Sequence, residues 1–298
     1  MRKPPFLALF LLAAPAGAQP ARPTPTPPPS LRSEVPLPEP AGPKLGPAEC
    51  YAAAKDQTSF PPLLCAGAAT DAPAACFAAA KGLSDYPALL CSGAPSAGGP
   101  VDCFAAAKDL TRFPALLCSG AADAAPVACF NAVKGLTDYP ALLCSGAASA
   151  APAGCFEAAK DLTRYPALLC AGASSTAPVY CFKAAKDLTR FPALLCAGAA
   201  SLAPIECYNK AKGTTDYPAL LCSGATSNAP VDCFAAVKGL SENPALLCSP
   251  NGALKAVTLH NIDASYNLPY PFPFNNPYPF RYPFPDPNRD PSKPPAKP

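Results

Sequence analysis

Sixteen cysteines at two alternating spacings constrain the fold of this chain more than any other feature. Between Pro47 and Cys248 a unit recurs eight times, and each copy opens and closes with a cysteine. The two cysteines of a copy are always fifteen residues apart, and the next copy opens eleven residues later, or twelve between Cys91 and Cys103. A fixed period of this length is typical of a stacked repeat array, in which each unit packs on its neighbours.

Other residue types recur at fixed positions, which we number by their distance from the opening cysteine. Every copy has a proline three residues before that cysteine, an aromatic residue at position one, a lysine at position five and Ser or Thr at position eight. A second proline follows at position eleven, and Leu-Leu precedes the closing cysteine. All copies are therefore expected to share one backbone.

The first half of a copy predicts a helix, as the fourth copy illustrates. Proline fits a first helical turn because its missing N–H would have no partner there, so this helix is expected to begin near Pro126. Its apolar row is Cys129, Ala132, Val133 and Leu136. This spacing indicates one buried helical face.

The second half predicts another helix, antiparallel to the first. Thr137 is the expected N-cap, with Pro140 in the first turn, and Gly146 is the expected left-handed stop. Each helix is expected to run two to three turns, too short to be stable alone in water. In the eighth copy Pro250 replaces that glycine, which we interpret as the end of the array.

A disulfide within each copy is the expected cross-link. Pairing between copies would leave Cys50 and Cys248 without partners, and only the spacing between copies tolerates an insertion, at Gly98-Gly99. The zinc alternative lacks C-x₂-C spacing and has one histidine, His260, far from the array. The predicted bonds are Cys50–Cys65, Cys76–Cys91, Cys103–Cys118, Cys129–Cys144, Cys155–Cys170, Cys181–Cys196, Cys207–Cys222 and Cys233–Cys248.

Four segments are expected along the chain. Residues 1–18 are typical of a secretory signal peptide, with a charged start, a short apolar run and Ala16-Gly17-Ala18 at the cleavage site. Residues 19–46 form a Pro-rich linker, 47–248 the repeat array, and 249–298 a mostly disordered tail rich in proline and aromatic residues. Export agrees with the cysteine content, since disulfides need an oxidising compartment. We therefore expect a secreted, periplasmic or cell-envelope protein with no transmembrane segment once the signal is removed.

The fold class that follows is all-α, a solenoid of eight disulfide-stapled αα-hairpins. No single copy can bury its own apolar face, so the array should behave as one unit. The first and last copies depart most from the repeat, at Gln57, Pro62, Asn243 and Pro250. Atypical terminal copies are typical of an open stack whose ends are capped.

Lysine is the only charged residue that recurs in every copy. Stacking would set eight ammonium groups in a column down one face, which predicts a binding face for an acidic polymer or protein. The alternative is structural, with each lysine stem covering the aromatic ring four residues earlier. The residues of the column are Lys55, Lys81, Lys108, Lys134, Lys160, Lys186, Lys212 and Lys238.

Charges at position nine alternate with the residue at position six. Arg112 follows Asp109, whereas Asp138 follows Gly135, and most other copies obey the same rule. Neighbouring copies thus often carry opposite charges at position nine. This pattern predicts a ladder of ion pairs that selects the stacking register.

Catalysis and cofactors find no support in the sequence. It lacks G-x-S-x-G, H-E-x-x-H and Walker-type motifs, and the predicted bonds use every cysteine. We expect no catalytic, cofactor-binding or metal-binding residue and no small-molecule substrate. The net charge of +3 falls to +1 when Arg2 and Lys3 leave with the signal, which disfavours nucleic acid as a partner.

The predicted function is that of an exported, non-enzymatic binding or scaffold module acting through the solenoid surface. One alternative is a structural component of the cell envelope or matrix, held by the Pro/aromatic tail, whose Tyr270–Phe284 stretch could also grip a partner. A second alternative, an exported hydrolase, would need a pocket that near-identical copies do not build.

The array also resembles a known kind of repeat. The run Leu-Cys-Ser-Gly-Ala followed by Ala-Pro-Val-x-Cys-Phe-x-Ala-x-Lys is similar to repeats in exported bacterial proteins of unassigned function, over residues 47–248. More loosely, the array resembles tetratricopeptide-like cysteine-rich repeat proteins. The resemblance implies an exported helical repeat architecture and carries no activity or site residue.

Overall fold

The computed structural model describes residues 46–251, which form sixteen helices, two in each copy. The predicted signal peptide, the linker up to residue 45 and the tail beyond residue 251 lie outside the described residues. Residues 46–251 contain no strand, only four isolated bridges between residues at the helix turns. The expected all-α class is therefore confirmed.

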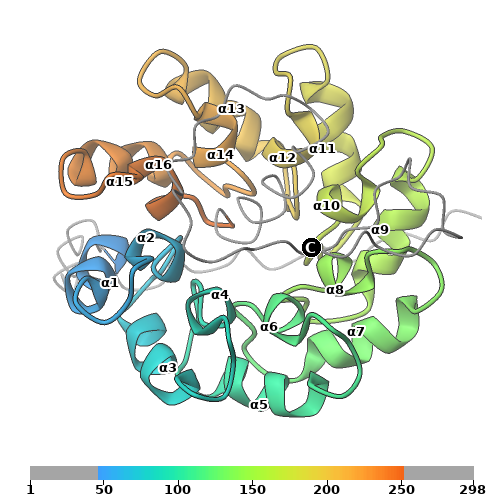
Figure 1. The fold of residues 1–298 in the computed structure, drawn as a ribbon. Coiled ribbons are helices and arrows are strands. Elements are labelled where there is room, and N and C mark those ends of the chain that lie inside the picture. The colour runs from blue at the N-terminus through green and yellow to red at the C-terminus, as the bar shows by residue number, and fades with distance from the viewer. Residues whose placement is uncertain (1–45, 252–298) are drawn as a thin grey trace, which may run out of the picture. The chain divides into compact units, whose positions relative to one another are not determined.

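Each copy contributes one longer outer helix and one short inner helix (Figure 1). The outer helices are α1 (Gly46–Ala54), α3 (Ala72–Ala80), α5 (Gly99–Ala107), α7 (Ala125–Val133), α9 (Ala151–Ala159), α11 (Ala177–Ala185), α13 (Ala203–Ala211) and α15 (Ala229–Val237). The inner helices are α2 (Pro61–Leu64), α4 (Pro87–Leu90), α6 (Pro114–Leu117), α8 (Pro140–Leu143), α10 (Pro166–Leu169), α12 (Pro192–Leu195), α14 (Pro218–Leu221) and α16 (Pro244–Leu247).

The outer helices begin where the first proline predicts. Pro126 is the second residue of α7, and the equivalent prolines stand at the same place in the other copies. A side-chain oxygen two residues before the helix often satisfies its first N–H, as when Ala151 N–H donates to Ser149 Oγ at 3.2 Å. The nine-residue length, two and a half turns, agrees with the expectation.

The inner helices are shorter than predicted, a single turn of four residues. Tyr139 precedes Pro140 at φ −122° and ψ 51°, outside the helical region, because a residue before proline is excluded from that region. The helix can therefore begin only at the proline. The predicted N-cap is also wrong: the N-cap position is Tyr139, whose own N–H donates to Thr137 Oγ1 at 3.2 Å, and no side chain caps the helix itself.

A disulfide joins the two helices of every copy, with the predicted pairing in all eight. In the fourth copy it links Cys129 in the buried face of α7 to Cys144, the residue that ends α8. The two leucines before each closing cysteine are buried beside it, and together these residues form one continuous apolar core that runs through all eight copies. The core thus lies between the outer and inner helices.

Successive copies are joined by a repeated backbone hydrogen bond. Gly146, at φ 60°, donates its N–H to the carbonyl of Leu117 in the preceding copy at 3.1 Å, and the equivalent bond recurs from the second to the seventh copy. Where position sixteen is serine, its hydroxyl adds a second bond, as from Ser145 Oγ to Leu116 O at 2.5 Å. The left-handed glycine predicted at this position is confirmed.

The array closes on itself, so the expectation of an open stack with capped ends is wrong. Gly67 of the first copy donates its N–H to the carbonyl of Leu247 in the eighth at 3.0 Å, the same bond that joins the second to seventh copies to their predecessors. The inner helices contact one another in an unbroken circuit in which α16 packs on α2 (Figure 1). Pro250 does not terminate the stack; it lies against Gly67 at the closing junction.

Candidate ligand-binding face

The eight predicted lysines are all exposed and occupy equivalent places. In seven copies the lysine is the C-cap, the residue directly after the outer helix, as Lys134 is for α7 and Lys160 for α9. A cation at a helix C-terminus is favoured by the helix dipole. The local structure therefore holds each ammonium group at the turn between the outer and inner helix.

Ring closure changes the geometry predicted for these lysines. The glycine–leucine bond joins seven of the eight pairs of neighbours, including the last copy to the first, and the inner helices contact one another around the whole circuit, so the array can have no net rise per copy. Equivalent residues must then lie at one level around the ring. The lysines form a circle around the ring, which we call the lysine face, and not a column along a stack.

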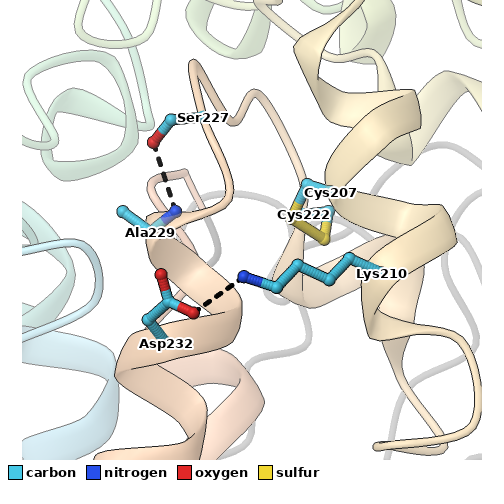
Figure 2. A network of polar contacts seen from close by, with 6 residues as sticks. All are labelled: Cys207, Lys210, Cys222, Ser227, Ala229 and Asp232. Atoms are coloured by element: carbon cyan, nitrogen blue, oxygen red, sulfur yellow. Dashed lines mark hydrogen bonds and ion pairs between the residues drawn. A yellow bond between two sulfur atoms is a disulfide. The ribbon is translucent and has the colours of Figure 1, made fainter.

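Acidic side chains interact with few of the lysines and arginines in residues 46–251. Lys160 Nζ lies 2.7 Å from Glu157 Oε2, and this exposed pair raises the pKa of Lys160 through the hydrogen bond and charge of Glu157. Lys210 of α13 reaches across to Asp232 of α15 at 2.9 Å (Figure 2). Lys210 lies on the outer helix and is not one of the circle, so this pair leaves the lysine face open.

The predicted ladder of ion pairs at position nine is not what the structure contains. Arg112 and Arg190 place their guanidinium groups 5.9 Å from the ring centres of Phe113 and Phe191, the next residues in the chain. Among the described side chains, no direct ion pair joins either arginine to an acid at position nine of a neighbouring copy. A cation over an adjacent aromatic face needs no contact between copies, so it competes locally with the ladder.

The residue at position six determines the backbone conformation of the turn that follows the outer helix. Where it is glycine, the preceding lysine is extended, as Lys134 is at ψ 116°, and the glycine takes a positive φ, 93° at Gly135. Where it is aspartate, the lysine stays helical, as Lys160 does at ψ −33°. The alternation that the sequence presents as charge is therefore an alternation of two turn types.

Exposed leucines lie beside the lysines, and sequence reasoning missed them. Leu136 was expected in the buried row of the first helix, but α7 ends at Val133 and Leu136 is 46% exposed. Leucine stands at position seven in six copies, with exposed fractions from 43% to 59%. These residues are Leu83, Leu110, Leu136, Leu162, Leu188 and Leu240. The early end of the outer helix is the signal that would have placed them outside.

The charge of the lysine face varies around the ring. In the third, fifth and sixth copies the face carries Lys, Asp and Arg at positions five, six and nine, which leaves one net positive charge in each. In the remaining copies lysine is balanced by one acid, as Lys134 is by Asp138. Burial and the charge of Asp138 also raise the pKa of the adjacent Tyr139. The face is basic mainly over the third to sixth copies.

An axial cavity of about 200 Å³ lies at the end of the inner helices. It is lined by residues at positions sixteen and seventeen of six copies and by Pro250 and Asn251. Three of the lining serines turn their hydroxyls to the preceding copy, and the glycines have no side chain, so backbone forms most of the wall. Residues from seven copies can meet in one cavity only because the ring is closed.

A second cavity, of about 360 Å³, lies between the seventh and eighth copies. Its lining includes Asp216, Lys238, Glu242 and Asn243. Asn243 stands where the other seven copies have an aromatic ring, and this is the one junction with an acid at position nine on both sides. Near-identical copies were not expected to build such a pocket, and the departures from the repeat at this junction are the signal that could have located it.

Other chemistry predicted to be absent can be examined only in residues 46–251. In that range no group of three or more His, Cys, Asp or Glu residues is placed to hold a metal ion, and every cysteine is disulfide-bonded. The single histidine, His260, and the Tyr270–Phe284 stretch lie outside the described residues. None of the helices described is both long and apolar enough to cross a membrane.

Comparison with known proteins adds no further assignment. No protein-family model, curated protein sequence or solved structure matches this chain. The resemblance to exported cysteine-rich repeats therefore stays a prediction, and the function has to be argued from the geometry of the ring.

Proposed function

We propose that the protein is an exported, non-enzymatic binding or scaffold module that presents its lysine face to an acidic partner. The observation that carries this proposal is the exposure of all eight lysines at equivalent places in a closed ring. Eight disulfides support an oxidising compartment, which favours a secreted, periplasmic or cell-envelope location.

The closed ring favours a multivalent partner. A single exposed ammonium group attracts an anion weakly and is screened by salt within a Debye length of about 8 Å at physiological ionic strength. A circle of equivalent lysines lets a polyanion or an extended acidic surface engage several groups at once, and each further contact is then intramolecular. The proposal therefore predicts tight binding only to ligands that carry many negative charges.

Replacement of lysines tests this function directly. The variant K108Q/K134Q/K160Q/K186Q should bind polyglutamate or alginate several-fold more weakly than the wild type at low salt, because four contacts of the circle are lost. Circular dichroism should be unchanged, since all four side chains are exposed. Affinity would be measured by fluorescence anisotropy with labelled polymer over a range of salt concentrations.

A matched control separates the lysine face from net charge. K183Q/K210Q removes two exposed lysines of the outer helices, and K134Q/K186Q removes two from the circle. Both variants lose two positive charges, so a nonspecific attraction would weaken equally in both. We expect K134Q/K186Q to lose more affinity than K183Q/K210Q. Equal losses would show that the attraction is nonspecific. A pull-down from envelope extract that recovered only insoluble wall material, with no dependence on these lysines, would favour the structural alternative instead.

A further inference from the structure

We infer that the lysine face docks on an acidic lipid surface, with the position-seven leucines entering the headgroup region. This inference rests on the proposed function and names the partner of the same face. Three features of the ring support it: the core does not use these leucines, they lie at a common level, and most of them lie in or beside the basic copies.

The leucines at position seven are not required by the core. The leucine pairs of the inner helices are buried, with Leu143 fully inaccessible and Leu142 nearly so, and the core is continuous without position seven. Leu136 and its equivalents stay 43–59% exposed. Single exposed leucines are ordinary on protein surfaces, but six at one structural position form an organised apolar feature.

Closure places these leucines at one level. Each follows the lysine of its copy by two residues, in the turn between the outer and inner helices. Because the ring has no net rise per copy, the leucines form one circle and the lysines a second circle next to it. Neighbouring copies can therefore present leucine and lysine together to one surface.

The apolar and basic features coincide around the ring. The leucines are continuous from Leu83 to Leu188, in the second to sixth copies, and the copies with net positive charge are the third, fifth and sixth. The continuous stretch ends at polar residues on both sides, Gln57 in the first copy and Thr214 in the seventh. One arc of the face therefore combines exposed leucine with excess positive charge.

This combination favours lipid over a soluble polyanion. A hydrated acidic polymer offers charges to the lysines but nothing apolar for leucine to contact. Peripheral attachment to a membrane uses both leucine and lysine. Burial of apolar side chains at the headgroup boundary adds to the attraction between basic residues and anionic lipids. The leucines therefore distinguish the two partners.

Vesicle sedimentation tests the inference on the full mature protein. The wild type should sediment with vesicles made of equal parts phosphatidylglycerol and phosphatidylcholine, and not with phosphatidylcholine alone. L136S/L162S should lower the apparent affinity for the acidic vesicles roughly tenfold or more, because two apolar contacts are lost. The control Y180S/L202S removes exposed apolar residues at the opposite end of the outer helices and should bind like the wild type.

Binding of the same variants to soluble polyglutamate distinguishes failure of the lipid inference from failure of the proposed function. L136S/L162S should bind polyglutamate as the wild type does. If the wild type bound polyglutamate but not acidic vesicles, or if L136S/L162S bound vesicles unchanged, the lipid inference would be overturned and the proposed function would stand. If the wild type bound neither probe, both would fail.

Discussion

Glycine at position seventeen is the residue on which seven of the eight junctions between copies depend. Gly172 has φ 63°, and a β-carbon added there would lie 2.9 Å from the carbonyl oxygen of Ser145 in the preceding copy. Its N–H donates to Leu143 O at 3.1 Å. Only glycine satisfies the left-handed conformation and the close backbone approach together.

Replacement of this glycine should weaken the ring. Gly172→Ala is expected to lower the free energy of unfolding by about 1–3 kcal/mol, since a left-handed residue with a β-carbon is strained and the contact with Ser145 must open. The measurement is denaturant unfolding followed by circular dichroism.

A second glycine in the same copy supplies the control. Gly154, within α9, has open space where a β-carbon would lie. Gly154→Ala should therefore raise the free energy of unfolding by about 0.5–1 kcal/mol through helix propensity. If both substitutions had the same effect, the role assigned to Gly172 would be wrong.

The helices show how far local sequence signals determine the elements. Pro126 and Gly146 are predictable because each acts through its own backbone: proline by its fixed φ and missing N–H, glycine by its access to positive φ. Thr137 suggests a longer inner helix because it is a good N-cap residue. Pro140 excludes Tyr139 from the helical region, so the helix begins only at the proline. The disulfides were predictable because the spacing within a copy is always fifteen residues, as expected when a covalent bond closes that loop and excludes insertions.

The disulfide is expected to hold each hairpin together. α8 is a single turn and has no stability of its own, so its position depends on Cys144 and on burial of Leu142 and Leu143. Replacement of Cys129 and Cys144 together by alanine should lower the free energy of unfolding by about 3 kcal/mol, the loop-entropy value for this separation. An unchanged unfolding midpoint would contradict this role, whereas loss of all helical signal would show that one hairpin controls the whole array.

Closure of the ring is the property that the repeat pattern could not predict. It requires each copy to turn by one-eighth of a full rotation with no rise, and that angle depends on how the inner helices pack, which a period along the chain does not record. The sequence identifies the lysines of the candidate face because they recur in every copy. Their arrangement in a circle follows from closure, which the sequence does not show. The leucines beside them were missed because Leu136 continues the apolar spacing of a helix that ends at Val133.

The junctions of the eighth copy account for two of its atypical residues, Asn243 and Pro250. Pro250 has no N–H and cannot repeat the glycine bond, yet Ser249 Oγ still donates to Leu220 O at 2.6 Å, so the eighth copy keeps one of the two usual links to the seventh. Asn243 therefore belongs to the junction between the seventh and eighth copies, and Pro250 lies both at that junction and against Gly67 of the first copy, so neither residue caps a free end. The flat circle of lysines exists only if the closing junction holds.

Hydrogen exchange at the Gly67 amide tests closure most directly. In the closed ring this N–H donates to Leu247 O at 3.0 Å, as Gly146 donates to Leu117 O at 3.1 Å, so the two amides should be protected to a similar degree. An open array would leave Gly67 without a preceding copy to accept its hydrogen bond. Exchange at Gly67 as fast as in an unstructured peptide, with Gly146 still protected, would contradict the ring and with it the common level of the lysines.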